Sequence, residues 1–386
     1  MRLLTSFAVV VCLFAFGIHA ETVQPEDVKS IAKDPRSNDW YLAQAELWKK
    51  HVDGNPRDDR AWRNYYFAVR YANFTKEGPL TFGKDKKAAL AEIVEKMRKA
   101  VPLSCNTYFV RLFDVPLEQA DLKLVREANR ACPESMELLE QSVFLYEVCG
   151  AGEDMKNACR KIYQAGRVEN EWLDYNYNLL VSADSNAILF TNGDNDTYPA
   201  WILQKALGIR EDVLILNRYM VFKKKSYLLD KLKEKKINIQ PEALPSTQDP
   251  TEFLAKLSAL IKKQNPDIPV YFAITINDMK SLDSNLYNVG LVSAYSASPV
   301  DNIALLRRNF ETRYRLDYLS FDWQENKKAP ASRSFDANYI YPLLILMRHH
   351  KVVGEIEKVA YWRDLTERIM RRTGNEKALP MLKEFE

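Results

Sequence analysis

The stretch ILFTNGDNDTYPAWILQ, residues 188–204, decides the fold of the second half of this chain. A short run of apolar and β-forming residues ends in Asn, Gly and Asp, and a Pro and an amphipathic run follow at once. This order is typical of a buried strand that turns sharply into a helix. Two carboxylates, Asp194 and Asp196, lie one residue apart at the turn, so the same stretch is also a candidate site.

Segments with strand and helix patterns alternate on either side of this stretch. Further strands are predicted in VLILNRYM (213–220), IPVYFAITIND (268–278) and VGLVSAYS (289–296). Helices are predicted in YPAWILQKALG (198–208), SYLLDKLKEKK (226–236) and DPTEFLAKLSALIKKQ (249–264), with Gly208 ending the first and Asp249 or Thr251 capping the last. The alternation predicts a Rossmann-like, mostly parallel α/β domain over residues 186–335. A C-terminal helical hairpin, broken near Gly354, is predicted over residues 336–386.

The acidic turn supports two interpretations. Ligands of open α/β sheets bind beyond the carboxyl ends of the strands, where this turn lies. The spacing of Asp194 and Asp196 matches the D-x-D pattern with which many sugar-nucleotide transferases hold a divalent cation, and such oxygen ligands suit Mg²⁺ or Mn²⁺. In the other interpretation the turn is structural: Asn192, Gly193 and Asn195 tolerate positive φ, and Asp196 or Thr197 caps the following helix.

Other polar residues are predicted to line the same crevice, because they follow the second and third strands. The candidate ligand-binding residues are Asn192, Asp194, Asn195, Asp196, Thr197, Tyr198, Trp201, Asn217, Arg218 and Asn277, with Asp278 beside the last. Asp194 and Asp196 are the candidate metal ligands. No catalytic residue is identified, since the only histidines beyond residue 20 are His51, His349 and His350, far from this motif in sequence.

The first half of the chain, residues 21–185, has the pattern of consecutive helices. In three stretches an aromatic or apolar residue is followed by a Pro and then by the start of the next predicted helix. We call this pattern the repeated frame; the stretches are WKKHVDGNPRDDRAW (48–62), VEKMRKAVPLSCNTY (94–108) and VREANRACPESMELL (125–139). A degenerate fourth copy runs through Ile162, Ala165 and Asn170. The prolines are 46 and 31 residues apart (102 − 56 and 133 − 102), and the first interval contains the inserted loop 73–87. This resembles a tetratricopeptide array, whose period is about 34 residues.

Such arrays stack helical hairpins into an α-solenoid, because one hairpin cannot bury its own apolar face. They commonly bind a protein or peptide, and we expect a protein partner here; alternatively, the array only supports the second domain. Acidic and basic residues are well mixed, 52 against 55 with a net charge of +3, so no nucleic-acid partner is predicted.

The N-terminus predicts export. Arg2 precedes the apolar stretch 3–18, and cleavage is expected near Ala20, so residues 1–20 have the pattern of a signal peptide. No later apolar run is long enough to span a bilayer. We therefore predict a periplasmic protein that is not membrane-spanning after cleavage. Its four remaining cysteines are predicted to form the bridges Cys105–Cys132 and Cys149–Cys159.

The sequence of residues 188–217 carries a resemblance to a known family. With its strand, the GDNDT-aromatic-Pro motif and a second strand ending in Asn217, it resembles the soluble C-terminal part of a bacterial membrane-protein family. That family is related to protein O-mannosyltransferases and is known as domain of unknown function 2723. The resemblance covers about residues 186–350 and implies a shared α/β module. The family's membrane helices are replaced here by a signal peptide and helical repeats, so the resemblance does not carry over transferase activity.

These observations predict an exported, non-enzymatic envelope adaptor or scaffold without a cofactor. Its repeats would bind a protein partner, and its α/β module would be a recognition domain, with a carbohydrate or another cell-envelope component as a further candidate ligand. The alternative is a carbohydrate-active or sugar-phosphate enzyme that uses Asp194 and Asp196 with Mg²⁺ or Mn²⁺.

Overall fold

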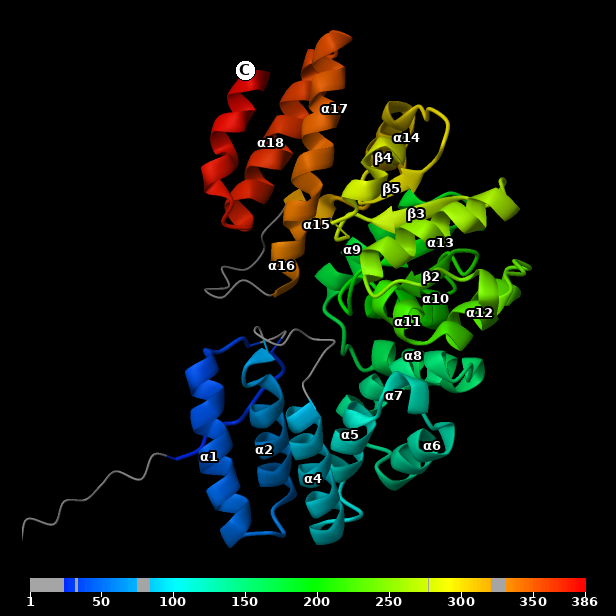
Figure 1. The fold of residues 1–386 in the computed structure, drawn as a ribbon. Helices are drawn as coiled ribbons and strands as arrows, with labels where there is room; N and C mark the ends of the chain where they lie inside the picture. Colours follow the sequence, from blue (N-terminus) through cyan, green and yellow to red (C-terminus); the bar gives the residue numbers. More distant parts are fainter. Residues whose placement is uncertain (1–23, 32–33, 75–83, 277, 321–330) are drawn as a thin grey trace, which may run out of the picture. The chain divides into compact units, whose positions relative to one another are not determined.

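A computed structural model describes residues 24–31, 34–74, 84–276, 278–320 and 331–386. The chain is mostly helical, carries a five-stranded mixed sheet, and divides into two compact units, Met1–Val101 and Pro102–Glu386 (Figure 1). The predicted signal peptide lies outside the described residues, among which no helix is long and apolar enough to cross a membrane. The domain boundaries predicted at residues 185 and 335 stay predictions.

In the described part of the first unit, helices pack against one another in chain order. They are α1 (Asn38–Gly54), α2 (Asp59–Tyr71) and α4 (Lys84–Ala100). The α1–α2 junction is fixed by Trp62, whose indole N–H donates to the carbonyl of Pro56 at 2.9 Å. Trp48 and Trp62, the aromatic residues of the repeated frame, are both buried where α1 and α2 pack together.

Three helix junctions along the chain share one local pattern. A helix ends, a Pro follows two residues later, and a capping side chain two residues beyond the Pro starts the next helix. The pairs are Pro56 with Asp58, Pro102 with Ser104, and Pro133 with Ser135. Each capping oxygen accepts from a backbone N–H in the first turn, at 3.0–3.4 Å. The Pro disfavours helical conformation in the preceding residue, and the cap satisfies a free amide of the next helix.

The second unit begins with helical pairs and one disulfide. Its first helices are α5 (Cys105–Asp114), α6 (Leu122–Ala131), α7 (Met136–Val148), α8 (Gly152–Gln164) and α9 (Asn170–Ser182). Cys105 opens α5 and Cys132 caps α6, and their Cα atoms lie 5.7 Å apart. The predicted Cys105–Cys132 bridge is present.

The predicted Cys149–Cys159 bridge is wrong, because both thiols are free. Cys149 caps the end of α7, whereas Cys159 is the eighth residue of α8 and lies about 10 Å along that helix from its start. Cys159 is fully buried in the core, and this burial raises its pKa to about 12. A buried, neutral thiol on the inner face of α8 acts as a small apolar side chain.

The sheet is mixed rather than mostly parallel. Its strands are β1 (Ile188–Thr191), β2 (Leu214–Asn217), β3 (Val270–Ala273), β4 (Leu286–Asn288) and β5 (Val292–Tyr295), in the order β2-β1-β3-β5-β4. β1 pairs in parallel with β2 and β3, but β5 is antiparallel to both β3 and β4. The three residues between β4 and β5 reverse the chain at Gly290, whose φ of 128° suits glycine. A turn this short imposes antiparallel pairing.

Helices lie on both sides of the parallel strands. The connection β1–β2 contains α10 (Tyr198–Leu207), and the connection β2–β3 contains α11 (Arg218–Lys223), α12 (Lys225–Glu234) and α13 (Pro250–Gln264). These connections run in opposite directions across the sheet, so right-handed crossovers place their helices on opposite faces. Accordingly, α10 packs with α8 and α9, whereas α11 packs with α12 and α13. As predicted, Gly208 ends α10 in a left-handed conformation and Asp249 caps α13.

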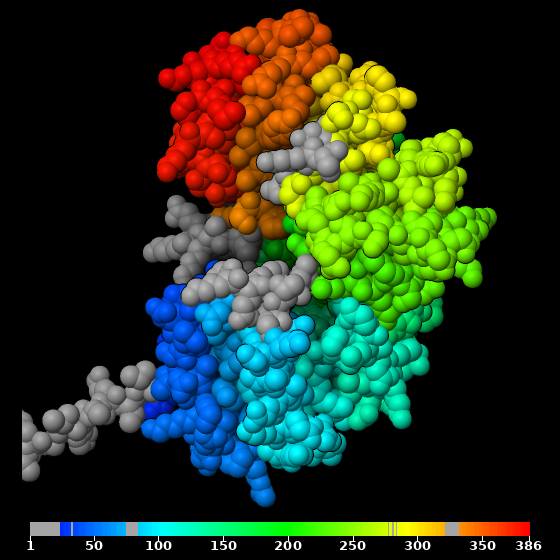
Figure 2. Space-filling view, in the orientation of Figure 1, coloured from blue at the N-terminus to red at the C-terminus, as the bar shows by residue number. Residues whose placement is uncertain are grey.

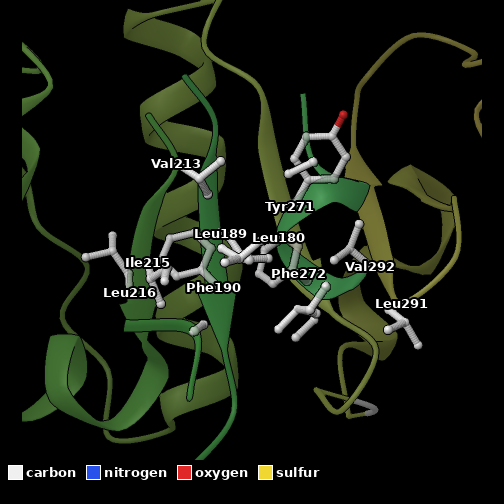
Figure 3. Packing of buried hydrophobic residues seen from close by; sticks show 14 of the residues in the cluster. Leu180, Leu189, Phe190, Val213, Ile215, Leu216, Tyr271, Phe272, Leu291 and Val292 are labelled. Carbon is white, nitrogen blue, oxygen red and sulfur yellow. The ribbon is translucent and has the colours of Figure 1, made fainter. Parts of the chain in front are cut away.

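The core of the second unit lies on the central strands. Phe190 of β1 and Phe272 of β3 stack with ring centroids 5.3 Å apart on one face of the sheet, whereas the register places Ile215 of β2 and Val292 of β5 on the opposite face (Figure 3). All four of these side chains are at most 2% exposed. Burial on both faces explains why these strands appear in the sequence as continuous apolar runs rather than alternating ones.

The rest of the unit is helical. It contains α14 (Asn302–Arg308), the π-helix η4 (Asn309–Arg313), α15 (Asp317–Ser320), α16 (Ala331–Phe335), α17 (Ile340–Val352), α18 (Ile356–Arg372) and the 3₁₀ segment η6 (Glu376–Phe385). Gly354 has a φ of 78° and turns the chain from α17 into α18. These two helices pack together, and η6 covers α18, as the adjoining orange and red surfaces show (Figure 2).

Helix α9 ties the sheet to these late segments. The Asn178 side-chain amide donates to the carbonyl of Arg315 at 2.8 Å and to the hydroxyl of Tyr339 at 2.9 Å, and its oxygen accepts from the Arg315 N–H at 2.7 Å. Asn178 is fully buried. These bonds span 137 and 161 residues of sequence, so α9 belongs structurally to both the sheet and the C-terminal helices.

Candidate functional site

The NGDND loop, residues 192–196, leaves β1 at the carboxyl end of the sheet. β1 lies between β2 and β3, so the loop starts where the strand order reverses. Asn217 ends β2 and Thr275 follows β3, and both contact the loop or the residue after it. This is the position at which doubly wound sheets hold their ligands.

The Asp196 carboxylate is engaged by the protein itself. Its two oxygens accept the backbone N–H groups of Asn192 and Gly193, both at 2.8 Å, and one also accepts the hydroxyl of Thr275. Asp196 is only 1% exposed. Burial raises the pKa of this carboxyl, while the three hydrogen bonds favour the charged form and oppose the rise.

The structural interpretation of Asp196 therefore needs one correction. The sequence predicted that Asp196 or Thr197 caps the following helix, but the residue at the cap position, Thr197, makes no side-chain capping bond. Asp196 instead bonds amides that precede it in the loop. It holds the strand exit closed and links it to Thr275 after β3, 79 residues further along the chain.

A second set of hydrogen bonds fixes the other side of the loop. The Thr197 hydroxyl donates to the carbonyl of Gly193 and accepts from Thr191 at 2.7 Å and from the Asn217 amide at 3.1 Å. The Asn217 oxygen in turn accepts the N–H groups of Tyr219 and Met220 and caps α11. Thr191, Thr197 and Asn217 are all buried, so these groups hold the architecture and have little spare capacity for a ligand.

Asp194 differs from Asp196 because it is exposed and its carboxylate has no hydrogen bond or ion pair with another described residue. Its backbone carbonyl accepts the N–H groups of Thr197 and Tyr198 and closes the turn. Desolvation by the surrounding protein, and then the charge of Asp196, raise its pKa. Because the side chain is exposed, water solvates the ionised carboxylate directly and opposes this rise in the pKa. The backbone carbonyl of the neighbouring Asn195 accepts the side-chain amide of Asn176 at 2.9 Å.

Three of the other predicted site residues, Tyr198, Trp201 and Arg218, have different environments. Trp201 is 3% exposed and belongs to the core, and Tyr198 packs beside it with a buried hydroxyl that has no partner among the described residues. Arg218 is committed to Asp278 by two bonds of 2.9 and 3.0 Å. Burial opposes ionisation of Asp278, but Arg218 and Thr251 outweigh it and lower its pKa. Asn277 lies outside the described residues.

These contacts test whether a divalent cation fits the loop. Mg²⁺ requires close to six oxygen ligands in octahedral geometry. Both Asp196 oxygens already accept backbone amides, which leaves Asp194 as the free carboxylate of the pair. No group of three or more His, Cys, Asp or Glu residues suited to a metal occurs in the described ranges. A cation bridged by both carboxylates would have to share the Asp196 oxygens with these hydrogen bonds, and this metal pair stays a prediction.

Sequence reasoning missed Thr275, and it assigned Thr251 only to a helix cap and not to its bond with Asp278. Thr275 lies two residues beyond the end of β3, as Asn217 lies at the end of β2, so its position at a strand terminus was the available signal. Its partner could not be identified from sequence, because the register of β1 against β3 places the two segments side by side.

The fold and the loop together define a mixed α/β module whose acidic turn is bonded to its own backbone. Within it, residues 172–305 match the family model described as TMEM260-associated domain 2. The match begins in α9 and ends in α14, so it contains all five strands and the NGDND loop. It covers roughly a third of the chain. No curated protein matches this sequence.

Proposed function

We propose that this chain is an exported envelope protein that binds rather than catalyses, an adaptor or scaffold whose helical repeats engage a protein partner. One observation carries the choice of binding over catalysis: the Asp196 carboxylate is bonded to the amides of Asn192 and Gly193 and to Thr275. The D-x-D pair therefore offers a substrate or cation one carboxylate instead of two. In this proposal the NGDND loop is part of the framework that supports recognition.

The proposed architecture is a tetratricopeptide-like α-solenoid over residues 21–185 followed by a Rossmann-like domain and a C-terminal hairpin. The repeated junction of helix end, Pro and cap supports the first part, since it occurs at Pro56, Pro102 and Pro133 in the same frame. The parallel pairing of β1 with β2 and β3 supports the second part. A relation to the O-mannosyltransferase-related bacterial family belongs to this proposal and is supported by the matched residues 172–305.

The proposed location is the periplasm. The Cys105–Cys132 disulfide supports it, because such bonds persist in oxidising compartments outside the cytoplasm. The apolar N-terminal stretch predicted to be cleaved near Ala20 supports it independently.

Photocrosslinking tests the partner surface. A photoreactive residue would replace Leu42 on α1, which is 43% exposed, or Leu103 at a helix junction, which is 76% exposed. Met381 in η6, at 48% exposure, is a matched apolar control outside the repeats. We expect discrete adducts with envelope protein from positions 42 and 103 and none from 381. Adducts from position 381 alone would place binding outside the repeats and contradict the proposal.

The alternative is a divalent-metal enzyme acting on carbohydrate or sugar phosphate. The observation that favours it is Asp194 beyond β1, which is exposed and has no side-chain partner in the ranges that the structure describes. Such an enzyme would require Asp196 to leave its backbone amides. Calorimetric titration with Mn²⁺, Mg²⁺ and nucleotide sugars separates the two functions: the adaptor gives no saturable heat, whereas heat that Asp194→Ala abolishes would establish the enzyme.

A further inference from the structure

A second polar site lies away from the NGDND loop. A cavity of about 460 Å³ opens between η4, α15 and α18. We call it the aromatic pocket; its floor is Phe310, Leu316 and Trp362, all at most 8% exposed. Pockets of this volume are typical of sites that hold small ligands or single side chains.

Local helix geometry builds the aromatic pocket from two directions. In η4 the N–H of Tyr314 donates to the carbonyl of Asn309 at 2.9 Å, five residues back, and the wide turn directs Phe310 and Tyr314 to the pocket. Single π-turns of this kind are frequent at functional sites. On α18, Glu357 and Tyr361 are four residues apart and so share the face that meets η4.

The Tyr314 wall is fixed in place before any ligand arrives. Its hydroxyl accepts the N–H of Leu291 at 3.0 Å and shares a hydrogen bond with Ser182. Gly290 leaves room for this hydroxyl, since a Cβ at that position would lie 2.1 Å from it. The phenol oxygen is thus bonded to the β4–β5 turn and to α9, and the ring is left as an apolar wall of the pocket.

The rim of the pocket is acidic. Glu311, Asp317 and Glu357 line it against one cation, Lys358. The Lys358 ammonium lies 3.4 Å from Glu311 and 3.3 Å from Glu355, so its charge is already balanced. Asp317 and Glu357 are exposed and have no ion pair or hydrogen bond with another described residue. Two carboxylates with no partner in the described part of the chain therefore lie beside four aromatic rings.

The geometry points to a binding site for a lysine or arginine side chain of a partner protein. The apolar stem would lie on Phe310 and Leu316, the cation would meet the faces of Tyr361 or Trp362, and Asp317 and Glu357 would balance its charge. A neutral sugar would also stack on the rings, but it would leave both carboxylates without a counter-charge. The assignment rests on the proposed function, because it specifies which side chains of the proposed protein partner this chain would bind.

The test uses the full mature chain and four short capped peptides, Gly-X-Gly with X as Lys, Arg, norleucine or Glu. The Trp362 indole resonance, assigned with Trp362→Phe, reports binding. We expect saturable shifts with the Lys and Arg peptides and at least about tenfold weaker binding of the norleucine peptide, which has the stem without the charge. The Glu peptide gives no shift. The Lys and Arg shifts weaken at high salt.

Matched variants locate the site. Two variants change exposed side chains of the pocket: the double variant Asp317→Asn with Glu357→Gln, and the single variant Tyr361→Ala. Each should weaken binding of the Lys and Arg peptides about tenfold. Asp364→Asn, an exposed acid of α18 outside the pocket, should change nothing. Equal binding of norleucine, binding of methyl β-D-glucopyranoside in place of the peptides, or no shift at all would overturn the assignment. None of these results alters the Mn²⁺ titration, so failure of this site and failure of the proposed function are separate outcomes.

Discussion

The NGDND loop and the aromatic pocket use their carboxylates in opposite ways. In the loop, Asp196 accepts two backbone amides and a hydroxyl and is almost completely buried. In the pocket, Asp317 and Glu357 are exposed and unpaired among the described residues. A carboxylate bonded inside the fold determines the shape of the chain, whereas a carboxylate without a partner can still bind another molecule. The conspicuous acidic motif of this sequence is therefore the more architectural of the two regions.

The largest expected effect separates the two aspartates of the loop. Asp196→Ala removes the acceptor of two partly buried amides and of the Thr275 hydroxyl, and it should lower the free energy of unfolding by about 4 kcal/mol. Asp194→Ala changes an exposed group and should cost less than about 0.5 kcal/mol. Urea unfolding of both variants measures the difference. Equal losses would mean that Asp194 is as structural as its neighbour.

The next effect links the sheet to the pocket. Gly290→Ala requires an L-residue at a φ of 128° and places a Cβ against the Tyr314 hydroxyl. We expect a loss of about 3 kcal/mol in unfolding free energy and weaker binding of the Lys peptide, because the Tyr314 wall shifts. Gly193→Ala is the control, since a Cβ there meets no atom within 4 Å. Unchanged stability of Gly290→Ala would show that the Tyr314 wall is mobile.

A smaller effect distinguishes two hydrogen-bonded acids by pH. The hydrogen bond from Arg210, ahead of weaker contributions, lowers the pKa of Asp212 to about 2. A lowered pKa stabilises the fold above the unfolded value near 4, and this contribution of about 1 kcal/mol, discounted for partial exposure, is lost as the pH falls to about 2. The cost of Asp212→Asn should therefore shrink between pH 5 and pH 2.

Asp196 should show the opposite slope in the same experiment. Its pKa is raised by burial, so the folded state binds the proton more tightly than the unfolded chain. The wild type then gains stability relative to Asp196→Asn as the pH falls toward 4. Parallel slopes for the two variants in urea unfolding at several pH values would contradict the assignment of opposite shifts.

The smallest effect concerns the pocket acids. Asp317→Asn and Glu357→Gln should each change the free energy of unfolding by less than about 0.5 kcal/mol, because neither side chain supports the fold. Thermal unfolding of both variants, with Asp364→Asn as the control, measures this change. A cost above about 1 kcal/mol would show that these carboxylates are structural, like Asp196.

The sequence predicted features that depend on neighbouring residues. The strands β1 and β3, the cap Asp249 and the ending glycine Gly208 all follow from local patterns. Strand β4 was missed because three residues give no readable alternation, and the incorrect prediction of a mostly parallel sheet followed from that omission. Asn217 was predicted to lie near the loop, since parallel strands end at one edge of a sheet.

The remaining features depend on contacts between distant segments. Thr275 meets Asp196 across 79 residues, and the aromatic pocket joins Phe310 to Trp362 through a π-turn that no local signal marks. The cysteines illustrate the same limit. Cys105 and Cys132 occupy the two ends of a helical pair, as the repeat frame predicts, whereas Cys159 turns inward for a reason that only packing reveals.

The buried Asn178 of α9 has a consequence for biosynthesis. Its amide finds its partners only when Arg315 and Tyr339 arrive, so a chain emerging from a ribosome or a secretion channel cannot complete this part of the core until most of its length is free. Until then the apolar surface around Asn178 stays uncovered, a state prone to aggregation. A factor that shields nascent chains would thus act chiefly before residue 339 appears, and C-terminal truncation would arrest the protein in that same vulnerable form.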